Sequence, residues 1–262
     1  LSAESRCACF TVFIGFVFPF VCFVCFVVNL LKMPANYQLV RLNNGICSVR
    51  SLVDAETFHP VVGPVAEAEA LYVNQLRLRE RLQNHSGEFV IWDVGLGAAA
   101  NALTVLRATR DIACRIRLVS FDHTLEPLKF ALQHAADLGY FGGYENHLGE
   151  FLDKGRVVFQ DGPQTVNWEF HPGDFPAWLA QMVVAGILPA VESGVPPGGK
   201  NGGGMERVES SCVNPGGRMP PSTAGRTPAA TAPHAILFDA YSPARNPAMW
   251  TLPLFTDLFR LL

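Results

Sequence analysis

The chain has 262 residues, of which 49% are hydrophobic and 16% are charged, well below the roughly 25% charged residues of an average soluble domain. Its 20 Lys and Arg residues nearly balance its 23 Asp and Glu residues, which gives a net charge of −3. The length and composition exclude a chain that is disordered throughout and a small fold that depends on disulfides. The charge excludes a strong basic field that would attract nucleic acid or anionic lipid.

The N-terminal segment, residues 1–32, is strongly apolar. Residues 7–31 carry no charged side chain, and about 20 apolar residues suffice to span a bilayer. The run therefore predicts a membrane anchor if it belongs to the natural protein. The alternative is spurious upstream sequence, because the chain starts with Leu1 and a conventional sequence opens at Met33. Cys47, Cys114 and Cys212 are scattered without His partners at ligand spacing, which favours a reducing, cytoplasmic compartment and predicts no metal site.

Residues 33–262 read as one domain in which strands and helices alternate. Apolar runs predict strands over 37–42, 46–49, 89–94, 116–121, 166–171 and 235–238, and helical periodicity predicts helices over 65–82, 98–110, 125–138, 175–184 and from 252 to 262. A Gly- and Pro-rich stretch, residues 189–234, has no apolar period and predicts a disordered insertion. The alternation predicts an α/β fold with a Rossmann-like parallel sheet and helices on both faces.

The strongest local motif follows the strand over 89–94. Asp93, Gly95 and Gly97 form a D-x-G-x-G pattern, in which the glycines permit a tight turn and close approach of a ligand to the backbone. Asp122, at the end of the next strand, is placed to hold ribose hydroxyls. These features fit S-adenosylmethionine, and they also fit a dinucleotide, so a dinucleotide-binding oxidoreductase stays open as an alternative.

Acidic residues at further strand ends favour S-adenosylmethionine. A carboxylate at Asp93 would face a dinucleotide pyrophosphate unfavourably, but it suits a ligand with an ammonium and a sulfonium group. Gly173 and Asp174 follow the third buried strand, where the carboxylate could accept a hydrogen bond from an adenine amino group. Asp239 follows the fourth strand.

The segment after that strand, DAYSPARNPAMWTLPLF at residues 239–255, resembles the D-G-F-A-P-x-K-N-P-x-M-W-T-x-x-L-F signature of the MnmC methyltransferase family. Gly95 and Gly97 match the glycine loop of that family, and EALYV at residues 69–73 is similar to its E-T-R-Y-V-F segment. The resemblance implies a class I S-adenosylmethionine-dependent methyltransferase fold. It also implies methyl transfer to the aminomethyl group of a tRNA wobble uridine.

The chemistry of methyl transfer to an amine suggests roles within this segment. Asp239 is expected to orient the amine and receive its proton, with Tyr241 as a second catalytic residue. Arg245, Asn246 and Trp250 are expected to contact the tRNA substrate, although Arg245 stands where the family has Lys. The flavin-dependent half of the bifunctional members has no counterpart in this chain. The family fold continues beyond the last predicted helix, so we expect the sheet to lack one edge. A non-catalytic, membrane-tethered relative is the remaining alternative.

Overall fold

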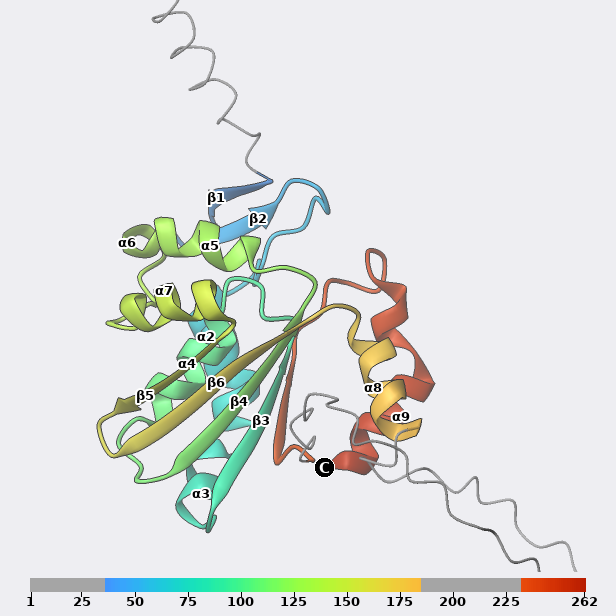
Figure 1. The fold of residues 1–262 in the computed structure, drawn as a ribbon. Coiled ribbons are helices and arrows are strands. Elements are labelled where there is room, and N and C mark those ends of the chain that lie inside the picture. The colour runs from blue at the N-terminus through green and yellow to red at the C-terminus, as the bar shows by residue number, and fades with distance from the viewer. Residues whose placement is uncertain (1–35, 185–231) are drawn as a thin grey trace, which may run out of the picture.

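The computed structural model describes residues 36–184 and 232–262 (Figure 1). The predicted segment 1–32 and nearly all of the predicted insertion lie outside these ranges. A two-stranded antiparallel hairpin and a five-stranded sheet make up the β-structure. The hairpin consists of β1 (Tyr37–Arg41) and β2 (Cys47–Ser51), and the sheet consists of β3 (Glu88–Val94), β4 (Arg115–Asp122), β5 (Arg156–Asp161), β6 (Gln164–Pro172) and β7 (Ala235–Phe238).

The large sheet has the strand order β5-β6-β4-β3-β7. Four of its strands run parallel, because β3 pairs in parallel with β4 and β7, and β4 pairs in parallel with β6. This confirms the predicted parallel sheet for every strand that was predicted in it. The edge strand β5 was not predicted, and it corrects the all-parallel prediction because it pairs with β6 in the antiparallel direction.

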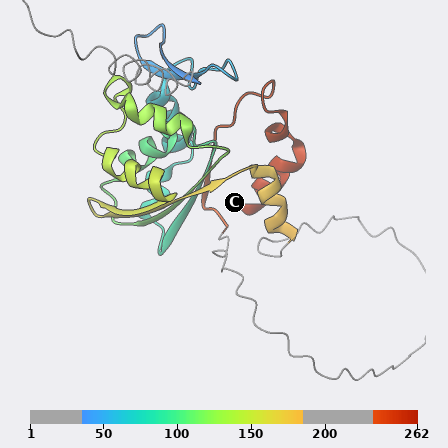
Figure 2. The ribbon, with the colours of Figure 1, turned by 45° about the horizontal axis from the view of Figure 1, so that its top comes forward.

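Helices cover both faces of the sheet, as predicted (Figures 1 and 2). One face is covered by α2 (Pro64–Ala68), α3 (Leu78–Gln83), α4 (Ala100–Thr109), α5 (Glu126–Gln133), α6 (Ala135–Leu138) and α7 (Glu145–Lys154), of which α7 was not predicted. The other face is covered by α8 (Phe175–Val184), the 3₁₀ turn η2 (Pro247–Trp250) and α9 (Leu252–Leu261).

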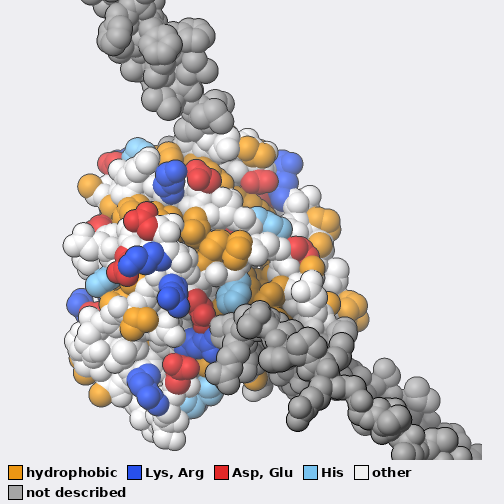
Figure 3. Space-filling view, in the orientation of Figure 1, with side chains coloured by type: hydrophobic (Ala, Val, Ile, Leu, Met, Phe, Trp, Pro, Cys, Tyr) orange, Lys and Arg blue, Asp and Glu red, His pale blue; other side chains and the backbone are white. Residues whose placement is uncertain are grey.

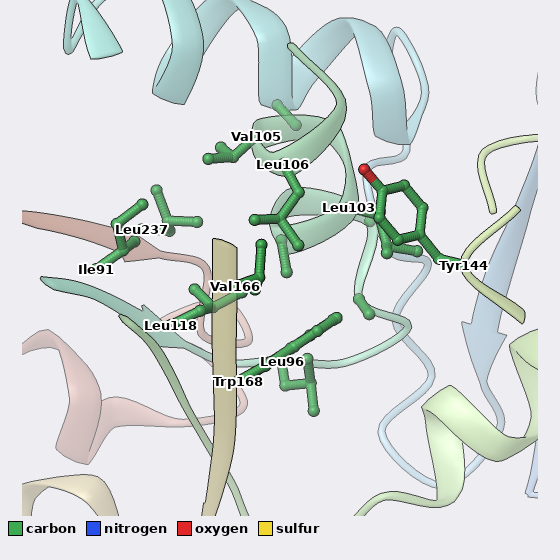
Figure 4. Close-up of a cluster of buried hydrophobic side chains, with 14 of the residues drawn as sticks. Ile91, Leu96, Leu103, Val105, Leu106, Leu118, Tyr144, Val166, Trp168 and Leu237 are labelled. Atoms are coloured by element: carbon green, nitrogen blue, oxygen red, sulfur yellow. The ribbon is translucent and has the colours of Figure 1, made fainter. Parts of the chain in front are cut away.

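Strand β3 lies at the centre of both hydrophobic layers. Phe89 and Ile91 belong to the cluster under α4, whereas Val90, Trp92 and Val94 belong to the cluster under α8 and α9. Figure 4 shows side chains of the first cluster, in which residues of the strands meet residues of α4. Because both faces are buried, the strand reads as a continuous apolar run, which is why its position could be predicted.

Two predicted helices are interrupted. The helix predicted over 65–82 consists of α2, a π-helical segment η1 (Glu69–Asn74) and α3, and Arg77 before α3 has a left-handed φ of 51°. The helix predicted over 125–138 is divided at His134 into α5 and α6. No helix in the described ranges combines the length and the apolar character needed to cross a membrane.

The end of the predicted insertion needs a correction. His234, its last residue, belongs to the folded structure, because its backbone N–H donates to the Val90 carbonyl at 2.7 Å and its Nδ1 accepts from the Val90 N–H at 2.9 Å. These bonds extend the pairing of β7 with β3. Within the described ranges, β7 is an edge strand that pairs with β3 alone.

Candidate functional site

A cavity of about 910 Å³ lies at the carboxyl ends of the parallel strands. Its wall includes residues that follow β3, β4, β6 and β7, together with the loop between β2 and α2. The chain leaves β3 for β4 on one side, whereas β7 pairs on the other side of β3. Crevices at such a switch point are the usual ligand sites of open parallel sheets.

The glycine loop after β3 forms part of this wall. Gly95 has a φ of 91°, and a Cβ atom at this position would lie 2.4 Å from the Asp239 carbonyl oxygen. Gly97 has a φ of 50°, and its N–H donates to the Asp122 carboxylate at 2.9 Å. A glycine at position 95 is therefore needed for the end of β7 to approach the loop this closely.

Asp122 and Asp239, both predicted, lie in the wall with their carboxylates partly satisfied by the protein. Asp122 accepts from the N–H groups of Gly97 and His123 at 2.9 and 2.7 Å. Asp239 accepts from the Asn101 amide at 2.7 Å. Burial raises the pKa of both carboxyls, and these partners oppose the rise.

Asp93, also predicted as a ligand contact, does not line the cavity. Its side chain is 1% exposed and accepts a hydrogen bond from the Ser120 hydroxyl at 2.7 Å. Ser120 in turn accepts from the Trp168 indole N–H at 2.9 Å. Burial raises the pKa of Asp93 to about 7, although the Ser120 bond lowers it. Asp93 thus joins β3, β4 and β6 behind the glycine loop.

The third strand end contributes its glycine but not its carboxylate. Gly173 lines the cavity with a φ of 123°. Asp174 is exposed, and its carboxylate accepts from the Ala177 N–H at 3.0 Å, as expected of the N-cap of α8.

The segment after β7 brings three of the expected site residues, Tyr241, Arg245 and Asn246, into the wall. The Tyr241 ring packs 5.8 Å from the Phe58 ring, measured between centroids, and burial raises the pKa of its hydroxyl. Trp250 lies outside the wall. Its indole N–H donates to the Tyr241 carbonyl at 2.7 Å, so Trp250 supports the segment after β7 from outside the cavity.

Several site residues were missed because they come from the irregular loop before α2 and from α2 itself. Glu56 accepts hydrogen bonds from the N–H and the hydroxyl of Ser242, which ties this loop to the segment after β7. His59 lies between Glu67 and Asp239, at 3.5 Å and 3.4 Å respectively. No sequence motif marks these residues, since they meet the strand ends only through the tertiary fold.

The charge of the wall is predominantly negative. Carboxylates come from Asp54, Glu56, Glu67, Asp122 and Asp239, whereas guanidinium groups come only from Arg50 and Arg245 among the described residues. This balance suits a cationic ligand and disfavours a pyrophosphate.

One group of the wall has the residue types of a metal site. His59, Glu67 and Asp239 can each bring one ligand atom to within 4.8 Å of the others. We assign no metal to them, because the two ring nitrogens of His59 face different carboxylates.

Neither a family model nor a curated protein matches the chain. Among solved structures it is similar to MnmC2 from Aquifex aeolicus, with a TM-score of 0.53 and 15% sequence identity. The chain has an MnmC2-like fold. This confirms the predicted α/β architecture and, at the level of fold, the resemblance to the MnmC family. The match covers 92% of this chain and 63% of the MnmC2 chain.

Proposed function

We propose that the chain is an S-adenosylmethionine-dependent N-methyltransferase that acts on the aminomethyl group of a tRNA wobble uridine. The observation that carries this proposal is the carboxylate-rich cavity at the ends of β3, β4, β6 and β7, beside a glycine loop. The MnmC2-like fold supports the class of acceptor. A purely structural strand–helix turn would not need so many carboxylates around one hollow.

The residues of the wall fit S-adenosylmethionine. The negative wall matches its ammonium and sulfonium groups, and the Asp122 carboxylate keeps lone pairs free for ribose hydroxyls beside Gly97. Gly173 leaves room for the adenine without a side chain. When bound, S-adenosylmethionine supplies an activated methyl group.

Asp239 is the proposed catalytic residue. A protonated amine has no lone pair, so it must lose a proton before its nitrogen can form a bond to carbon. The Asp239 carboxylate is partly buried, is oriented by Asn101, and has a raised pKa, so it is a stronger base than an exposed Asp. Tyr241, which packs on Phe58, shapes the acceptor side of the cavity.

Titration calorimetry tests the cofactor. We expect S-adenosylmethionine to bind the full chain and NAD to bind at least tenfold more weakly, because the pyrophosphate meets a negative wall. Tighter binding of NAD would favour the dinucleotide-binding oxidoreductase instead.

A methylation assay on tRNA that lacks the final methyl group tests the reaction. Asp239→Asn should lower turnover by about 10²–10⁴-fold, the usual contribution of a general base, while the affinity for S-adenosylmethionine is retained. Asp174→Asn is the matched control, because this carboxylate caps α8 outside the cavity. Unchanged turnover in Asp239→Asn would remove Asp239 from the mechanism.

A further inference from the structure

His59 is a buried histidine between two carboxylates. Its Nδ1 atom lies 3.5 Å from a Glu67 oxygen and its Nε2 atom lies 3.4 Å from an Asp239 oxygen, while its side chain is 7% exposed. Nδ1 has no hydrogen-bond partner among the described residues. A neutral imidazole can donate from only one nitrogen, whereas the imidazolium ion donates from both. A ring with a carboxylate on each side is therefore best matched by the charged form.

The backbone of His59 has an unfavourable conformation. Its φ is 49°, in the left-handed region, which is costly for a residue with a side chain. The preceding residue is fixed, because the Phe58 N–H donates to the Val49 carbonyl at 2.8 Å and the Phe58 carbonyl accepts from the Ser48 hydroxyl. Strain of this kind persists only where the surroundings determine the geometry, and it gathers at functional sites.

The groups that face this histidine are acidic or neutral. Glu67 approaches from α2 and Asp239 from the end of β7, while Asn101 of α4 reaches Asp239 from another side. The Tyr72 hydroxyl of η1, whose pKa is raised by burial and by the charges of Asp239 and Glu67, donates to the Phe238 carbonyl at 2.7 Å. No Lys or Arg in the described ranges forms an ion pair with Glu67 or Asp239. Burial lowers the pKa of His59, but Glu67 and Asp239 outweigh this effect and raise the pKa above 6.5.

We propose that His59 is a positioning residue for Asp239. The imidazolium ion of His59, anchored by Glu67, keeps the Asp239 carboxylate ionised and oriented toward the acceptor amine. The catalytic part of this inference rests on the proposed function. Burial of Asp239 favours its neutral form, yet only its ionised form can accept a proton. A cation at 3.4 Å favours the ionised form. Asn101 fixes the same oxygen from another side.

NMR of the full chain tests the charge arrangement without any enzyme assay. The ring nitrogens of His59, assigned by comparison with His59→Gln, should titrate with an apparent pKa above 6.5. Glu67→Gln and Asp239→Asn should each lower this pKa, since each removes one negative charge. Glu69→Gln is the matched control, because Glu69 lies two residues from Glu67 and is exposed, and it should leave the pKa unchanged. A pKa below 6.5, or equal shifts in Glu67→Gln and Glu69→Gln, would overturn the proposal.

The pH profile of methyl transfer tests the link to catalysis. In His59→Gln the acid limb of kcat/KM should move to higher pH, because Asp239 loses the cation that keeps it ionised, and kcat near neutral pH should fall roughly tenfold or more. The KM for S-adenosylmethionine should be unchanged. His59→Lys should restore the position of the acid limb. An acid limb that stays in place in His59→Gln overturns the positioning role. Should the wild type be inactive on the tRNA, the proposed function fails, whereas the NMR result still decides whether His59 is held as an imidazolium ion.

Discussion

Gly95 is the residue with the tightest steric constraint in the candidate site. Its φ of 91° and the 2.4 Å separation that a Cβ would have from the Asp239 carbonyl both oppose any side chain. Gly45 has a similar φ of 85° in the hairpin turn, with nothing within 4 Å of its Cβ position. Gly95→Ala should therefore lower the free energy of unfolding by more than Gly45→Ala, for which backbone strain alone predicts about 1–2 kcal/mol.

Urea unfolding of the two variants measures this difference, and titration with S-adenosylmethionine adds a functional readout. Gly95→Ala should lose binding because the end of β7 has to move away from the glycine loop. Gly45→Ala should keep it. Equal losses of stability in the two variants would show that the close approach of Asp239 contributes nothing.

The pH dependence of stability at Asp93 follows from its burial. Its pKa is raised from 3.8 in the unfolded chain to about 7 in the fold. Between these values the folded state holds a proton that the unfolded state has released, so stability falls as pH rises from about 4 to 7. Asp93→Asn stays neutral and should remove this part of the decline in urea unfolding series at several pH values. A slope identical to that of the wild type would place the titrating group elsewhere.

At this scale the sequence predicts the residues whose position follows from a strand end. Gly95, Gly97, Asp122 and Asp239 lie in the cavity wall because parallel strands bring their carboxyl ends to one edge. Sequence alone does not tell which way a strand-end carboxylate points. Asp93 turns into the sheet toward Ser120.

The sequence also does not distinguish a strand-end carboxylate that caps the following helix, as Asp174 does, from one that contacts a ligand. Contacts between segments that are distant in the chain leave no local pattern either. His59 and Glu67 lie far from Asp239 in the sequence but close to it in the fold, and nothing in the residues around them indicates this contact.

At the scale of elements, the parallel strands were predictable and the antiparallel edge strand β5 was not. Strands β3 and β4 are buried on both faces over most of their length, whereas β5 alternates buried and exposed residues along its length. This weaker pattern belongs to a half-exposed strand in a hairpin with β6. The interruption of the helix over 65–82 was equally hidden, because the π-helical segment is only six residues long and its residues include the strong α-helix formers Glu, Ala and Leu.

Helix α9 offers a test of how the second hydrophobic layer is held. Thr251 is its N-cap, and the hydroxyl accepts from the Leu254 N–H at 3.4 Å. Thr251→Ala should cost about 1 kcal/mol in the free energy of unfolding. Thr256→Ala lies in the same helix, where its hydroxyl donates to the Leu252 carbonyl at 2.8 Å, and should cost less.

Urea unfolding gives both costs, and hydrogen exchange at the first turn of α9 locates the effect. A larger loss for Thr256→Ala than for Thr251→Ala would contradict the capping role. Because Leu254, Leu258 and Leu261 pack under this helix with Val94 of β3, fraying of its first turn would also loosen the back of the cavity.

At the scale of the whole molecule, charge limits how a nucleic acid can bind. The chain carries a net charge of −3, and on the face shown in Figure 3 the basic and acidic side chains are interspersed rather than gathered into one basic patch. A tRNA would therefore depend on a few local contacts, and because each neutralised phosphate adds only about one to the slope of log affinity against log salt, the salt dependence should be shallow. Near the cavity, Arg245 is exposed and has no ion-pair partner among the described residues.

Arg245→Ala should therefore weaken binding of the unmethylated tRNA and reduce the slope of log affinity against log salt by about one phosphate contact. Arg260→Ala is the matched control, because Arg260 lies on α9 away from the cavity and pairs with Asp257 at 3.8 Å. Filter binding at several salt concentrations measures both slopes. S-adenosylmethionine affinity should stay constant in Arg260→Ala, because Arg260 lies outside the cavity, and should not fall in Arg245→Ala, because this variant leaves the wall more negative. If Arg260→Ala lowers the slope as much as Arg245→Ala, the tRNA contacts the molecule through diffuse charge rather than at the mouth of the cavity.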